Sequence, residues 1–302
     1  MRKWWTYQRE RFPLVAHGAL IASFSFCAVS LSHALRGAAG WPDWQSLVVA
    51  FGTCFAFFLQ LRIADEFKDA EDDARYRPYR PVPRGLVTLR ELAAVFALAA
   101  LVQLLLALWL DARLVILLAI TWAYLAAMSR EFFVAEWLRP RYVLYMVSHM
   151  VIMPLVDLYA TSTDWLVAGS KPPDGLLWFL LTSYCNGLNV EIGRKIRSPA
   201  DEEEGVVTYS RLWGRPRAVL CWWAVTAASG VSALVVASRL GLEWPEGAVL
   251  LCAFIVMLGV GIAYLRRAQP GRGTWIEHGS GAWTLILYLS LGLMPHATGR
   301  LH

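Results

Sequence analysis

Nine apolar runs of roughly 16 to 22 residues divide this 302-residue chain, and they limit its possible folds more than any other feature. About 20 apolar residues in a helix cross the ~30 Å hydrocarbon core of a bilayer. Only 17% of the residues are charged, against about 25% in soluble domains. We therefore predict an all-α, polytopic membrane bundle of about nine transmembrane helices, forming one domain over residues 1–302. The expected spans are 14–35, 44–63, 91–110, 113–128, 142–161, 175–193, 217–238, 246–265 and 280–297.

The distribution of basic residues predicts the orientation of these spans. With nine spans, 23 of the 28 Lys and Arg residues fall on the side of the N-terminus. Cytoplasmic loops carry an excess of Lys and Arg, so we expect a cytoplasmic N-terminus and an external C-terminus, in a bacterial inner (cell) membrane. The basic loops indicate anionic lipid headgroups or phosphates as partners, not nucleic acid. No feature indicates an obligate protein partner.

A charged segment over residues 62–85 begins directly at the end of the second span. Asp65, Asp69 and Asp73 are four residues apart, so on a continuous helix their carboxylates share one broad face. Three like charges on one face indicate a divalent cation, and Mg²⁺ suits one or two carboxylates together with substrate phosphates. Cationic side chains that could bind phosphate oxygens follow: Arg75, Arg77, Arg80 and Arg84. The alternative is a solvated helix with ion pairs such as Glu71 with Arg75.

A second charged segment, residues 186–214, follows the sixth span and falls on the same predicted side. It contains Asn186, Asn189, Glu191, Arg194, Lys195, Arg197 and the acidic run 201–204. Two acidic segments that face each other across a cavity could hold metal around a diphosphate and stabilise the charge of that leaving group. This second cluster favours the metal site over the solvated helix.

The two segments resemble the motifs of the UbiA superfamily of intramembrane prenyltransferases. "DEFKDAEDD" at 65–73 with "RPVPRG" at 80–85 is similar to the first motif, NxxxDxxxD with an Arg-Pro tail. "EIGRK" at 191–195 with "DEEEGVVTYSRLWG" at 201–214 is similar to the second, an acidic stretch before a Gly and a Thr-containing run. The number of spans, the placement of the motifs and the chain length extend the resemblance over essentially the whole chain.

The resemblance implies a helical bundle around a lipid-accessible central cavity, with Mg²⁺-dependent transfer of an isoprenoid from its diphosphate to an aromatic or lipid acceptor. It implies metal-binding and catalytic roles for Asp65, Asp69, Asp73, Glu191 and Asp201. Substrate-binding roles are expected for Lys68, Arg75, Arg77, Arg80, His149, Asn186, Asn189, Arg194 and Lys195. His149 is an ionisable residue inside a span, and such residues are candidates for a functional site.

Departures from the family pattern leave the second site open. Asp65 stands where the family has Asn, and Lys195 stands where an acidic residue is expected. Pro199 interrupts the helix register before Asp201. Three possibilities follow: Glu191 with 201–204 binds the second metal, or Arg194 and Lys195 replace it as diphosphate clamps, or this site has lost catalysis.

Three functions are compatible with these features. The leading hypothesis is a prenyltransferase. The second is a UbiA-type terpene cyclase, which ionises the same prenyl diphosphate and folds the chain onto itself. The third is a non-catalytic lipid or quinone carrier, or a transporter, on the same scaffold. The first acidic motif argues against a carrier, because a carrier needs no site for metal and diphosphate.

Overall fold

The computed structural model describes residues 2–297, and this part of the chain contains helices and no strand. Arg300 and the C-terminus, which enter the predicted orientation, lie outside the described residues. The elements are α1 (Arg2–Arg11), α2 (Leu14–Leu35), α3 (Trp44–Lys68), α4 (Ala70–Tyr76), α5 (Leu89–Leu110), α6 (Leu114–Ser129), η1 (Glu131–Phe133), α7 (Ala135–Leu138), α8 (Tyr142–Met150), α9 (Ile152–Trp165), α10 (Leu176–Arg194), η2 (Pro199–Asp201), α11 (Tyr209–Trp213), α12 (Arg215–Ser238), α13 (Glu243–Arg266) and α14 (Arg272–Ala297).

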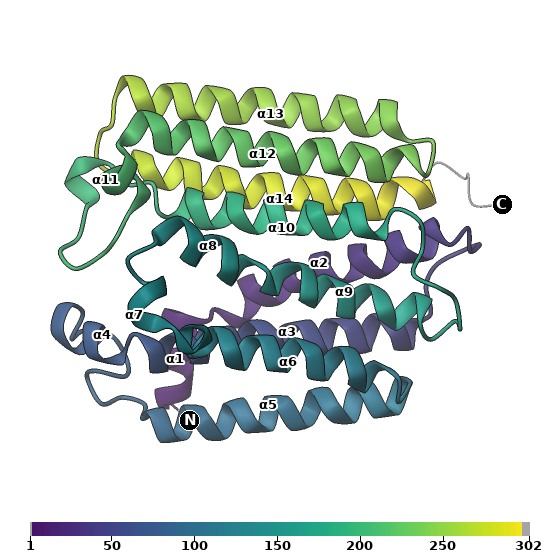
Figure 1. The fold of residues 1–302 in the computed structure, drawn as a ribbon, viewed down its shortest axis with the longest axis horizontal. Coiled ribbons are helices and arrows are strands. Elements are labelled where there is room, and N and C mark those ends of the chain that lie inside the picture. The colour runs from purple at the N-terminus through teal and green to yellow at the C-terminus, as the bar shows by residue number, and fades with distance from the viewer. Residues whose placement is uncertain (1, 298–302) are drawn as a thin grey trace.

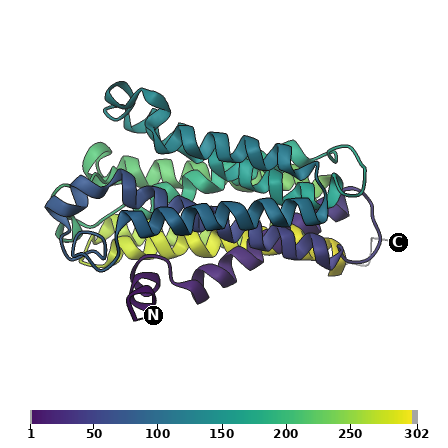
Figure 2. The ribbon, with the colours of Figure 1, turned by 90° about the horizontal axis from the view of Figure 1, so that it is seen from below.

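The long helices run side by side in one bundle (Figure 1). Helices α10, α12, α13 and α14 pack together on one side, and α3, α5 and α6 form the other side. Helices α2 and α9 contact both groups and join them. Figure 2 shows α1 beside the N-terminal label, at an angle to the long helices.

Small residues permit the closest contacts between these helices. A Cβ added to Gly292 of α14 would lie 2.5 Å from the Cβ of Cys27 on α2. This distance is shorter than any real Cβ contact, so α2 and α14 approach as closely as they do because residue 292 has no side chain. Packing that depends on small residues is typical of helices in membranes.

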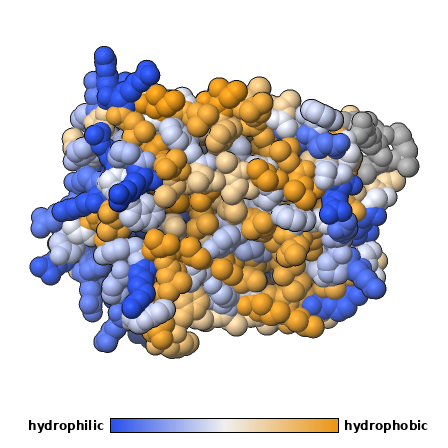
Figure 3. Space-filling model, turned by 45° about the horizontal axis from the view of Figure 1, so that its top comes forward, coloured by the Kyte–Doolittle hydropathy of each residue, from blue (hydrophilic) through white to orange (hydrophobic). Residues whose placement is uncertain are grey.

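Within residues 2–297, six segments are long and apolar enough to cross a membrane: α2, α3, α5, α8 with α9, α12 and α13. An apolar belt separates two hydrophilic ends of the surface (Figure 3), as expected for an integral membrane protein. The predicted count of nine spans is not confirmed. Helix α6 has only 16 residues, and α10 and α14 are less apolar because buried polar side chains such as Asn186, Asn189 and Ser280 interrupt them.

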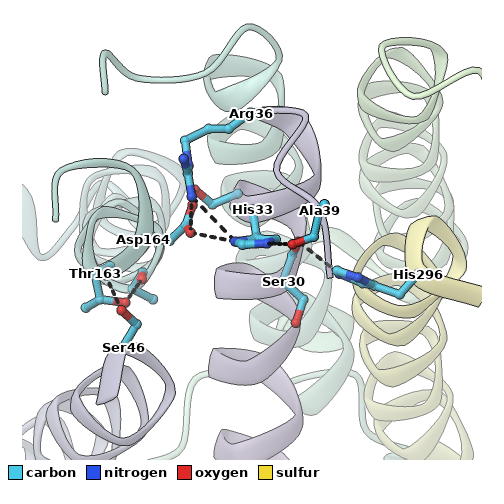
Figure 4. A network of polar contacts seen from close by, with 10 residues as sticks. Ser30, His33, Arg36, Ala39, Ser46, Thr163, Asp164 and His296 are labelled. Atoms are coloured by element: carbon cyan, nitrogen blue, oxygen red, sulfur yellow. Dashed lines mark hydrogen bonds and ion pairs between the residues drawn. The ribbon is translucent and has the colours of Figure 1, made fainter. Parts of the chain in front are cut away.

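A polar network fastens the end of the bundle away from the charged segments (Figure 4). Asp164 at the end of α9 is only 6% exposed. Its carboxylate accepts hydrogen bonds from Ser32 Oγ (2.7 Å) and from Nε and Nη2 of Arg36 (2.8 and 2.7 Å), and lies 3.1 Å from Nδ1 of His33. Ser46 Oγ on α3 donates to the Thr163 carbonyl at 2.6 Å. The network therefore ties α9 to both α2 and α3.

Replacement of Asp164 by Ala should destabilise the bundle. The change leaves the partly buried Arg36 guanidinium without its carboxylate, and loss of one partner of a buried ion pair costs about 3 to 5 kcal/mol. The matched control is Asp174→Ala, because Asp174 is 78% exposed in its pair with Arg239 and exposed pairs contribute only ~0–1 kcal/mol. Thermal unfolding in detergent measures both, and equal melting temperatures for the two variants would contradict this role.

Candidate functional site

The first charged segment keeps its carboxylates on one helical face, although the backbone leaves regular helical geometry at Asp69, between α3 and α4. The Asp69 N–H donates to the Asp65 carbonyl at 2.9 Å, and the Asp73 N–H donates to the Asp69 carbonyl at 2.8 Å. Since these are helical i to i−4 bonds, the register continues from α3 into α4. The three carboxylates differ in environment, because the Asp65 side chain is 54% exposed and that of Asp73 only 2%, with Asp69 between them.

A cavity of about 540 Å³ opens at this end of the bundle, between α3, α8, α9, α10 and the segment 195–208. Its charged wall contains ten of the predicted site residues: Asp65, Lys68, Asp69, Arg77, Arg80, His149, Glu191, Arg194, Lys195 and Asp201. Its apolar wall contains Leu61, Met128, Met146, Met150, Ile152, Met153, Val206 and Val207. The fold thus brings the two charged segments to one cavity, although more than a hundred residues separate them in the sequence.

Asp65 and Asp69 are the two carboxylates of the first charged segment that are available to a cation. Asp69 makes no ion pair with any residue in the range 2–297, and Asp65 pairs only with Arg62, at 3.6 Å. Burial, followed by the charge of Asp65, raises the pKa of Asp69 above its ordinary value, so its negative charge is incompletely compensated. Two carboxylates with open positions for phosphate oxygens and water suit Mg²⁺. In the described part of the chain, no three His, Cys, Asp or Glu side chains converge on one metal position.

Asp73 has a different environment, because two arginine side chains bind its carboxylate. Arg80 Nη1 donates to both of its carboxylate oxygens, at 2.8 and 2.7 Å, and Arg77 Nη1 lies 3.2 Å from one of them. Both arginines line the cavity, whereas Asp73 lies behind them. Asp73 therefore orients two cationic side chains along the cavity wall. Arg75 lies outside the cavity lining and stacks on Tyr76, 5.1 Å from the ring centre.

The second charged segment presents three cationic and three acidic side chains to the cavity: Arg194, Lys195, Arg197, Glu191, Asp201 and Glu203. Lys195 Nζ lies 2.8 Å from one oxygen of Glu191, and Arg194 Nε donates to the other at 2.6 Å. Asp201 accepts a hydrogen bond from the backbone N–H of Gly271 at 2.7 Å. Protein donors thus bind Glu191 and Asp201, which supports the clamp of Arg194 and Lys195. Glu203 also lines the cavity and makes no ion pair within residues 2–297, so the choice between the clamp and a second metal stays a prediction.

Asn186 and Asn189 lie within the bundle and outside the cavity lining. Asn186 accepts a hydrogen bond from Thr284 at 3.1 Å, and Asn189 accepts one from Thr226 at 3.0 Å. These bonds connect α10 to α14 and α12. Nothing in this geometry brings either amide to a substrate in the cavity, and their substrate-binding role stays a prediction.

A buried carboxylate that the sequence did not identify lies next to the cavity. Glu131 is 3% exposed and lies 3.1 Å from Lys68 Nζ and 3.2 Å from His149 Nε2. Burial alone would raise the pKa of Glu131, but the hydrogen bond from His149 and the charge of Lys68 outweigh it and hold the pKa below its ordinary value. Other residues of the cavity lining that the sequence did not assign to the site include Arg11, Arg62, Tyr145 and Arg197. No local motif marks these residues, since tertiary packing alone brings them here.

Both the sequence and the fold of this chain are similar to those of a known protein family. The model of the UbiA prenyltransferase family matches residues 22–277. None of the curated proteins matches the sequence significantly. Among solved structures, a UbiA homologue from Aeropyrum pernix K1 has a TM-score of 0.68 at 16% identity, covering 89% of this chain and 95% of its own. A digeranylgeranylglyceryl phosphate synthase has a TM-score of 0.64 at 15% identity, covering 98% and 99%. A UbiA homologue from Archaeoglobus fulgidus, bound to DMAPP and Mg²⁺, has a TM-score of 0.56 at 12% identity, covering 95% and 99%.

Replacement of Asp73 by Asn should lower the melting temperature, since it leaves two arginine side chains without a buried anionic partner. We expect a loss of unfolding free energy of about 3 kcal/mol, as for other broken buried pairs. Asp72→Asn is the matched control, because Asp72 is exposed on the same short helix. Thermal unfolding of the two purified variants measures the difference, and a wild-type melting temperature for Asp73→Asn would contradict the anchoring role.

Proposed function

This chain belongs to the UbiA prenyltransferase family, and we propose that it transfers an isoprenoid chain from its diphosphate to an aromatic or lipid acceptor within the membrane. The observation that carries the proposal is the cavity with one charged and one apolar wall. A prenyl diphosphate has the same division, with a trianionic head and a hydrocarbon tail. The volume of about 540 Å³ lies within the range of small-molecule sites.

The charged wall suits the diphosphate. Asp65 and Asp69 would hold Mg²⁺, which supplies positive charge to the leaving group when it is bound. Arg77 and Arg80, oriented by Asp73, and Arg194 and Lys195, held by Glu191, would bind the remaining phosphate oxygens. Fixed cations of this kind stabilise negative charge that develops as the bond to the diphosphate breaks. The homologue from Archaeoglobus fulgidus that is bound to DMAPP and Mg²⁺ supports this assignment.

The apolar wall suits the prenyl chain. Four of its eight side chains are methionines, and methionine adapts its shape to irregular apolar ligands. In the proposed reaction the bond between C1 and the diphosphate oxygen breaks, and its electron pair leaves with the diphosphate. The acceptor forms the new bond to C1 and loses a proton. Apolar side chains around C1 exclude water, which would otherwise compete as the nucleophile.

We also propose that this end of the bundle faces the cytoplasm of a bacterial cell, with the protein in the inner membrane. The support is the distribution of Lys and Arg, which concentrates on the loops beside the cavity. Cytoplasmic access would allow soluble prenyl diphosphates and Mg²⁺ to enter the cavity directly.

Release of diphosphate tests the proposed reaction. Purified protein is given geranyl, farnesyl or geranylgeranyl diphosphate with Mg²⁺, with and without a panel of phenolic and glycerol-phosphate lipid acceptors. We expect release that requires both Mg²⁺ and an acceptor. Release without acceptor, together with a hydrocarbon or alcohol product, would instead show a terpene cyclase. No release from any donor would support a carrier and contradict both enzymatic functions.

Asp69→Asn should reduce diphosphate release by roughly 100-fold or more, since removal of one group that stabilises the charge of a transition state typically has an effect of this size. Asp72→Asn changes the same residue type three positions later, on the exposed side of α4, and should retain the wild-type rate. The two rates are compared at saturating Mg²⁺ and donor. Equal rates for the two variants would show that the Asp69 carboxylate does not take part in the reaction.

A further inference from the structure

Three consecutive residues between α6 and α7 have left-handed backbone conformations. The φ angles of Glu131, Phe132 and Phe133 are +51°, +54° and +63°, and none of the three is glycine. Left-handed conformations are unfavourable for residues with a Cβ, and such strain persists only where surrounding contacts fix it. The strained turn therefore needs a structural reason, and the contacts of Glu131 supply one.

The turn directs the carboxylate of Glu131 into a buried position among three polar side chains. Lys68 Nζ lies 3.1 Å from Oε1, the Tyr145 hydroxyl donates to the same oxygen at 3.1 Å, and His149 Nε2 lies 3.2 Å from Oε2. The ammonium of Lys68 also lies 4.5 Å from the centre of the Tyr145 ring. Lys68 at the end of α3 is thus enclosed by a carboxylate, an aromatic face and an imidazole, which come from η1 and α8.

The position of Lys68 in the sequence would otherwise bring it to the candidate cation site. It lies three residues after Asp65 and one before Asp69, and side chains three apart on a helix are neighbours. An ammonium group bound to these carboxylates would compete with a divalent cation for the same oxygens. Within residues 2–297, however, Lys68 makes no ion pair with either of them, and its ion pair is with Glu131.

We propose that Glu131 is a positioning residue that draws Lys68 away from Asp65 and Asp69, and so keeps these two carboxylates free for a divalent cation. The proposal rests on the assignment of Asp65 and Asp69 as the cation site in the proposed function. Without the charge of Glu131, the partners of Lys68 become Asp65, on the same helix, and the adjacent Asp69, which line the same cavity. The binding of the cation then competes with an internal ion pair.

Direct binding of Mn²⁺ tests this role without any measurement of catalysis. The dissociation constant is measured by electron paramagnetic resonance of free Mn²⁺, on the full-length protein in detergent, with and without inorganic diphosphate. The variants are Glu131→Gln, Lys68→Gln, the double variant with both changes, and Glu136→Gln as a matched control. Glu136 is an exposed carboxylate on α7, five residues from Glu131.

Glu131→Gln should weaken Mn²⁺ binding roughly tenfold, within the range of coupling between neighbouring side chains in double-mutant cycles. Addition of Lys68→Gln should restore the affinity to within about twofold of the wild type, because the competing ammonium is then gone. Glu136→Gln should bind Mn²⁺ as the wild type does. Lys68→Gln alone should bind Mn²⁺ at least as tightly as the wild type, because a cationic side chain of the cavity wall is removed. If Glu131→Gln folds poorly, Glu131→Asp replaces it and should give a smaller loss that Lys68→Gln also removes.

Two results would overturn the positioning role. One is unchanged Mn²⁺ affinity in Glu131→Gln, and the other is a loss that Lys68→Gln does not restore, as expected if Glu131 only supports the fold. Failure of the proposed function is a separate result, because it is the absence of diphosphate release by the wild type. If the wild type releases no diphosphate but the variants show the expected changes in Mn²⁺ affinity, the positioning role of Glu131 is still supported.

Discussion

Compensation of negative charge at the end of the membrane helices is the constraint on which the rest of this site depends. A carboxylate without a partner in a low-dielectric environment is very unfavourable, and most of the buried carboxylates here have cationic partners. Each of these pairs joins two segments or holds a cation beside the cavity. The pairs are Glu66 with Arg11, Asp73 with Arg77 and Arg80, Glu131 with Lys68, and Glu191 with Arg194 and Lys195.

Asp65 and Asp69 depart from this pattern, and in the proposed function these two carboxylates bind the divalent cation. Within residues 2–297, Asp69 makes no ion pair and Asp65 pairs only with Arg62, while arginine and lysine side chains from both charged segments line the same cavity. A divalent cation on one wall and arginine and lysine side chains on the other would enclose a diphosphate from both sides. In the proposed function, the first charged segment would hold one metal, and the second metal site stays a prediction.

The sequence predicted much of this arrangement because local rules govern it. Helical spacing places Asp65, Asp69 and Asp73 on one face, and the hydrogen bonds between α3 and α4 preserve that face. The different environments of these three carboxylates were not predictable, because they depend on where the chain folds back after α4. Arg80 reaches Asp73 only through the turns at 77–85.

Glu131 illustrates the limit of sequence analysis. It follows an arginine at the end of an apolar run and resembles any charged loop residue. Its role depends on three left-handed residues and on contacts with α3 and α8, and neither has a signal in the local sequence. The sequence also did not predict that the side-chain oxygens of Asn186 and Asn189 accept hydrogen bonds from neighbouring helices, and their substrate-binding role stays a prediction.

Binding of an unreactive prenyl thiolodiphosphate tests the central claim most directly, namely that Asp65 and Asp69 bind the diphosphate through a divalent cation. The measurement is the thermal stability of the protein with the analogue, with Mg²⁺, with both, and with both plus EDTA. A ligand that binds only the folded state raises the melting temperature as its concentration exceeds the dissociation constant. The account predicts a large increase only when both analogue and Mg²⁺ are present, and none in Asp69→Asn. An increase of the same size in EDTA, or in Asp69→Asn, would contradict it.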